Sequence, residues 1–68
     1  MIIWRLRVVM AERDIKNKDL AKAMGVDDRV VSRWRSSSYV PKRLNVDILN
    51  RLCKELRCQP GDLLRFNL

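Results

Sequence analysis

The chain has 68 residues, of which 47% are hydrophobic, and its formal net charge at pH 7 is +7. A chain of this length forms one small domain and buries only about 60% of the surface that its unfolded form exposes. No apolar run approaches the roughly 18 residues that a membrane span needs, and no repeat is evident. We therefore expect a single domain over residues 1–68 and no membrane partner.

The first helix is expected from about Trp4 to Arg13, because Leu6, Val9 and Met10 are apolar at helical spacing. The apolar start of the chain is broken by arginines and lacks the long apolar centre of a signal peptide. We therefore expect a cytoplasmic protein, associated with the nucleoid if it binds DNA.

A second helix is expected from Lys18 to Met24, and it meets a third at a tight corner. Leu20 and Met24 are four residues apart, so both side chains lie on one helix face. Ala21 allows a crossing helix to approach closely, and Gly25 accepts the left-handed backbone of a helix end.

The third helix is expected from Asp28 to about Ser36, with the side chain of Asp27 as its N-terminal cap. Val30 or Val31, followed by Trp34, supplies the buried side of this helix. Its polar residues are then left facing outward.

The second half of the chain continues with a polar connection from Ser36 to Arg43, because Pro41 would break a helix. Asn45 is a suitable cap for a fourth helix. Pro60 fits the first turn of a last, short helix that ends near Leu64. The inner stripe of the fourth helix is expected to comprise Leu49, Leu52, Cys53 and Leu56.

The two ends of the chain carry more apolar side chains than a small five-helix core requires. Their β-branched and aromatic residues allow short extended segments that pair with each other. Alternatively they form an exposed patch for a second subunit, or they close the bottom of the core. For a second subunit, the expected interface residues are Ile2, Ile3, Trp4, Phe66 and Leu68.

The two cysteines, Cys53 and Cys58, are five residues apart, which on a continuous helix places them on different faces. The chain has no histidine, and two thiols alone make a poor zinc site. We expect both cysteines to act as small buried hydrophobic residues in a reducing compartment, with no metal and no cofactor.

The stretch Asn17–Trp34 resembles the helix-turn-helix of the Cro- and lambda-repressor-like (XRE-type) domains. Family members carry a small residue at the fifth position of the motif, glycine at the ninth, then branched apolar residues and an aliphatic residue or tryptophan. The matching residues here are Ala21, Gly25, Val31 and Trp34. The likeness extends over residues 4–65, and it implies an all-α, five-helix domain with the helix-turn-helix at its second and third helices.

Three positions depart from the family pattern. The motif usually opens with Thr-Gln, whereas this chain has Lys16-Asn17. The phosphate contact that the Gln commonly makes is therefore expected from Asn17 or Lys18. Arg57 stands where many relatives have glycine or asparagine, and a positive φ there would carry modest strain. The serines of 36–38 replace a more usual Asn-Gly turn.

The positive charge is concentrated near the motif. Between Arg29 and Arg43 there are five basic residues and no acidic one, whereas residues 44–68 are almost balanced. A positive stripe that coincides with the third helix and the loop after it indicates a polyanionic partner.

The resemblance implies that the third helix enters the major groove of double-stranded DNA. Arg29 and Arg33 lie four apart, and each is able to pair with guanine O6 and N7. Asp28 either accepts from cytosine N4 or favours the positive helix end, and the second role is preferred. Ser32 reaches a base or a phosphate. The expected phosphate contacts are Asn17, Lys18, Arg35, Ser36, Ser37, Ser38, Tyr39, Lys42 and Arg43.

The favoured function is a sequence-specific, DNA-binding transcriptional regulator, bacterial or phage-derived, that acts as a homodimer on half-sites about one helical turn apart. The alternative is a protein-interaction module or antitoxin-like regulator whose main partner is another protein. RNA binding is less favoured, because no glycine-rich clamp or paired-aromatic platform is present. An enzyme is not expected, since no serine or cysteine has an evident base.

Overall fold

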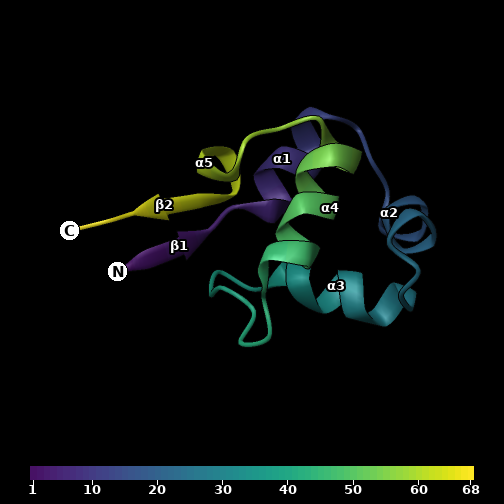
Figure 1. The fold of residues 1–68 in the computed structure, drawn as a ribbon, viewed down its shortest axis with the longest axis horizontal. Helices are drawn as coiled ribbons and strands as arrows, with labels where there is room; N and C mark the ends of the chain where they lie inside the picture. Colours follow the sequence, from purple (N-terminus) through teal and green to yellow (C-terminus); the bar gives the residue numbers. More distant parts are fainter.

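Five helices and a two-stranded ribbon make up the computed structural model, which describes residues 1–68 (Figure 1). The order along the chain is β1 (Ile2–Trp4), α1 (Leu6–Glu12), α2 (Asn17–Met24), α3 (Asp28–Ser36), α4 (Val46–Leu56), α5 (Pro60–Leu63) and β2 (Leu64–Phe66). The five expected helices are confirmed. None of them is both long and apolar enough to cross a membrane.

The chain ends pair with each other as an antiparallel ribbon, in the register Ile2↔Phe66, Ile3↔Arg65 and Trp4↔Leu64. Figure 1 shows this ribbon projecting from the helices with both chain ends at its tip. Pairing of the ends was the first of the three expected alternatives. The domain is therefore mostly helical with a small sheet, and not purely all-α.

Trp4 begins no helix, contrary to the expectation from the sequence, and lies in β1. Its side chain is only 4% exposed, and its indole Nε1–H donates to the carbonyl of Trp34 at 3.0 Å. Its backbone N–H donates to the carbonyl of Ser38 at 3.1 Å. These two bonds keep Trp4 extended and buried, so α1 starts at Leu6. Trp4 is a core residue, so its assignment to the expected subunit interface is wrong.

The core lies between the helices and the base of the ribbon. Its twelve buried residues are all hydrophobic, and no polar or charged residue is buried. The inward positions expected for α1 and α2 are confirmed, whereas Leu49 and Cys53 of α4 are only half-buried. The fully buried side chains are Leu6, Val9, Met10, Leu20, Val31, Leu52, Leu56 and Leu63.

The two cysteines lie together, because α4 does not continue through both of them. Arg57 ends the helix with φ 52° and ψ 53°, the left-handed conformation that the sequence had suggested. The chain then turns back, and the Cys58 N–H donates to the Cys53 carbonyl at 3.0 Å. Cys58 is buried and Cys53 is half-buried. The expectation of different helix faces does not hold, while burial is confirmed for Cys58.

Burial, together with the Cys53 thiol beside it, raises the pKa of Cys58 from 9.0 to about 11. The raised pKa makes Cys58 stabilise the fold below pH 9.0, and this contribution is lost as the pH rises to about 11. Between these pH values we expect the wild-type protein to lose more stability than Cys58→Ala, because only the wild-type protein has this thiol to ionise. Thermal unfolding followed by circular dichroism measures this difference. Parallel losses in the two proteins would contradict it.

Candidate nucleic-acid interface

The corner between α2 and α3 is formed as the sequence predicts. Gly25 has φ 70° and ψ 31°, and the N–H of Val26 donates to the carbonyl of Ala21 at 3.0 Å. A Cβ atom on Gly25 would meet no other atom within 4 Å, so the backbone conformation and not lack of space requires glycine here. Ala21 is buried at the crossing. The corner thus sets the angle between α2 and α3.

The start of α3 is held by the expected cap. Oδ1 of Asp27 accepts from the backbone N–H of Arg29 at 2.8 Å. This bond, followed by one from the Arg29 guanidinium, lowers the pKa of Asp27. Val31 is the one fully buried residue of the helix, and Trp34 packs half-buried against the core. One side of α3 therefore packs against the core, and the rest of the helix faces solvent.

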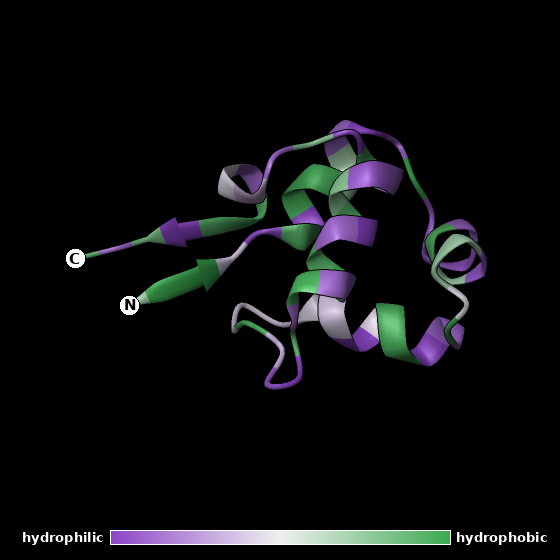
Figure 2. Cartoon of the chain, viewed as in Figure 1, coloured by the Kyte–Doolittle hydropathy of each residue, from purple (hydrophilic) through white to green (hydrophobic).

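All four residues expected to read bases are exposed on this helix: Asp28, Arg29, Ser32 and Arg33. The Arg29 side chain is 88% exposed, and its Nε lies 3.4 Å from Oδ1 of Asp27 in the one ion pair of the structure. Solvent screens such an exposed pair, so it competes weakly with a charged ligand. The Arg33 guanidinium has no hydrogen bond or ion pair. In Figure 2 the first turn of α3 is correspondingly hydrophilic.

The start of α2 is tied to the last turn of α3 by a bond that the sequence did not reveal. Nη1 of Arg35 donates to Oδ1 of Asn17 at 3.0 Å, and both residues are half-buried. The cap residue Lys16 makes no side-chain bond, so the first N–H groups of α2 stay open to an anion. Asn17, Arg35 and the exposed Lys18 therefore present donors from one end of the helix pair.

The serine run after α3 forms a turn held by its own side chains. Oγ of Ser37 accepts from the backbone N–H of Tyr39 at 3.0 Å, and Oγ of Ser36 donates to the carbonyl of Arg33 at 3.4 Å. Ser38 uses its carbonyl to bind Trp4. These bonds define the loop where the family's Asn-Gly turn is missing.

The loop also forms a cationic groove with the end of α3. This groove has a volume of about 430 Å³, and its lining includes Arg33, Tyr39, Lys42 and Arg43. The Tyr39 side chain is exposed, as are both loop cations. The fold thus joins one expected base-reading residue to four expected phosphate contacts, since Ser37 lines the groove as well, while Asn17 and Arg35 pair elsewhere.

A sequence profile described as the Cro/C1-type HTH DNA-binding domain matches residues 5–68. The chain belongs to this Cro/C1-type family. Over 65 residues it is 29% identical to YozG of Bacillus subtilis (strain 168), an uncharacterized HTH-type transcriptional regulator; the match covers 96% of this chain and 75% of that protein. A crystal structure of a candidate DNA-binding protein from Bacteroides fragilis is also similar, with a TM-score of 0.80 and 32% identity. That match covers 96% of this chain and 100% of the other.

Not every arginine of this Cro/C1-type domain is free for a partner. Arg13 donates through Nε to the carbonyl of Leu56 at 3.0 Å and through Nη2 to that of Arg57 at 3.2 Å. Arg51 donates through Nη1 to the carbonyl of Met24 at 3.2 Å. These guanidinium groups satisfy carbonyls at the ends of α4 and α2. Their partners are far away in the sequence, so no local pattern identifies them.

Proposed function

We propose that this protein is a sequence-specific transcriptional regulator that reads the major groove of double-stranded DNA with α3. The observation that carries the proposal is the exposure of Arg29 and Arg33 on a helix whose other side is anchored by Val31. An exposed guanidinium fork pairs well with guanine O6 and N7. Ser32 supplies a further polar contact, and Asp28 favours the positive end of the helix.

Phosphate contacts position the helix on both of its sides. Asn17, Lys18 and Arg35 bind one phosphate group near the start of α2, where open N–H groups attract anions. The loop after α3 supplies the other contacts, through its serines, Tyr39, Lys42 and Arg43. These contacts set the register on the duplex without reading sequence.

The regulator acts as a homodimer, because one α3 spans only a few base pairs. The tip of the ribbon is the proposed interface: Ile2 is 47% exposed and Phe66 67% exposed, and Ile3 and Leu68 lie beside them. Burying these side chains against a second copy removes apolar surface from water. A dimer of this kind acts in the cytoplasm, at the nucleoid, on two half-sites about one helical turn apart.

Selection of bound fragments from random duplex DNA tests the proposal. We expect enrichment of one short sequence, repeated with two-fold symmetry and containing a guanine in each half. A gel shift against unselected duplex at low salt serves as the reference for nonspecific binding. Absence of a shift even at low salt would contradict DNA binding and favour the alternative, a module or antitoxin-like regulator with a protein as its main partner.

The Arg43→Ala variant tests the phosphate contacts in the loop. We expect equal weakening of binding to all sequences, with the slope of log affinity against log salt shallower by about 0.9, because one phosphate is no longer neutralised. Fluorescence anisotropy over a salt series measures the slope. The control is Lys54→Ala, which removes an exposed charge from α4. An unaltered slope in Arg43→Ala would remove this residue from the contact set.

A further inference from the structure

The ribbon has a second surface whose basic residues lie outside the set that is proposed to contact DNA. Because side chains alternate along a strand, Trp4 and Leu64 share the face that packs on the core, and Ile3 and Arg65 share the opposite face. Arg5 follows on that same outer side, since its N–H donates to the carbonyl of Leu63 and continues the pairing. We call this surface the ribbon groove. It has a volume of about 450 Å³, and its lining includes Ile3, Arg5, Arg7, Val8 and Arg65, with Ser37 and Ser38 of the loop after α3.

The guanidinium groups of the ribbon groove are held in place by α5. Nη1 of Arg5 donates to the carbonyl of Asp62 at 3.4 Å, and Nε of Arg65 donates to the carbonyl of Gly61 at 2.9 Å. The terminal nitrogens of Arg65 remain available, and Arg7 is exposed. A guanidinium that is already oriented loses less freedom when it binds a carboxylate.

No carboxylate of the chain neutralises these arginines. The one ion pair in the structure joins Arg29 and Asp27, far from the groove in the sequence. The nearest candidate, Asp62, uses Oδ2 to accept from the backbone N–H of Gln59 at 2.8 Å, which caps α5. The groove is therefore a concentration of positive charge without an internal partner.

The edge of the ribbon offers backbone groups beside this charge. Arg5 pairs with Leu63 and Met1 with Asn67, so alternate residues of the two strands bond to each other. In an antiparallel pair the residues between them direct their N–H and C=O groups outward, which places those of Phe66 on the free edge of β2. An extended peptide can add to such an edge.

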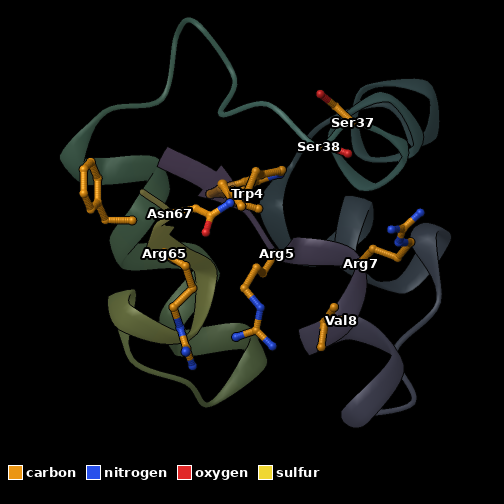
Figure 3. Close-up of a pocket in the computed structure, with 10 residues that line it drawn as sticks. Trp4, Arg5, Arg7, Val8, Ser37, Ser38, Arg65 and Asn67 are labelled. Carbon is orange, nitrogen blue, oxygen red and sulfur yellow. The ribbon is translucent and has the colours of Figure 1, made fainter. Parts of the chain in front are cut away.

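We propose that the ribbon groove binds an extended, acidic segment of a partner protein, with carboxylates on Arg7 and Arg65 and an apolar side chain against Val8. The charge of the chain, +7, disfavours a second copy of itself in this groove. Figure 3 shows the Arg5 and Arg65 side chains extending away from Ser37 and Ser38, the two serines that follow α3 and also line the groove. The inference does not depend on base reading by α3.

The test uses a labelled synthetic peptide that alternates glutamate with leucine, with fluorescence anisotropy as the readout. We expect R7E/R65E to bind it at least ~tenfold more weakly than the wild-type protein, and K22E/K54E, which changes the net charge equally, to bind within about twofold. In nitrogen-15 NMR spectra of the wild-type protein, the peptide should shift the signals of Ile3, Arg7, Val8 and Arg65 more than those of α3. Circular dichroism confirms that both variants fold.

Three results would overturn this assignment. Equal losses in the two double variants would show attraction by net charge alone, and no binding to the wild-type protein at low salt would show no peptide site. A gel shift with duplex DNA that R7E/R65E weakens far more than K22E/K54E does would assign the groove to nucleic acid. Failure of DNA reading by α3 would leave the two peptide measurements unaffected.

Discussion

Arg33→Ala is expected to lower affinity for the selected DNA site roughly tenfold to hundredfold, the range that loss of a bidentate guanine contact produces. Affinity for unrelated duplex should fall only a few-fold, because one positive charge among many is lost. The Arg33 side chain is exposed and has no hydrogen bond within the protein, so its removal leaves the fold intact. Anisotropy titrations with the selected site and a scrambled duplex measure the ratio of the two affinities.

The control for Arg33→Ala is Lys54→Ala, which removes one exposed charge from α4 on a different part of the surface. It should weaken binding to the two duplexes equally and slightly. If Arg33→Ala also reduced both affinities by one factor, Arg33 would be a phosphate contact and base reading would pass to other residues of α3. Because Arg33 lines one groove with Lys42 and Arg43, two expected phosphate contacts, the ratio of affinities distinguishes the two roles.

The parts of the fold that follow from local rules were predicted well from the sequence. Gly25 adopts the left-handed conformation, and Asp27 and Asn45 cap α3 and α4, as expected. Each of these features depends on residues only a few positions apart. Helix spacing left Val30 and Val31 open for the buried side of α3, and Val31 is the one that is fully buried.

The features that the sequence did not reveal depend on contacts between distant segments. Trp4 directly precedes apolar residues at helical spacing, but its bonds to Trp34 and Ser38 hold it in β1. The bond between Asn17 and Arg35 likewise joins two helices. A single sequence carries no sign of either pairing, because the partners of these donors are fixed only when the helices pack.

The same limit applies to the candidate site. Helix spacing identified the exposed residues of α3 correctly, and their exposure is confirmed. It did not show that Arg29 shares its guanidinium with Asp27 while Arg33 is unpaired. Since Arg29 must leave its carboxylate partner to bind a base, Arg33 is the more informative residue to substitute first.

Leu52→Ala is expected to destabilise the domain by about 2–5 kcal/mol, the usual cost of removing a buried leucine side chain. Leu52 is fully buried on α4, and a small apolar cavity of about 30 Å³ is already lined by Leu52, Trp4 and Trp34. A domain of this size has a total stability of only roughly 3–10 kcal/mol. The melting temperature should therefore fall by at least roughly 10 °C, as measured by circular dichroism.

Val46→Ala is the matched control, because Val46 lies on the same helix and is 71% exposed. Its effect on the free energy of unfolding should stay within about 0.5 kcal/mol. Similar losses in the two variants would contradict the role of Leu52 in the core, because alanine favours a helix at both positions. Leu52→Ala should also weaken binding to all DNA sequences equally. Val31, the buried residue of α3, and Trp4, which binds Trp34, belong to the same core as Leu52.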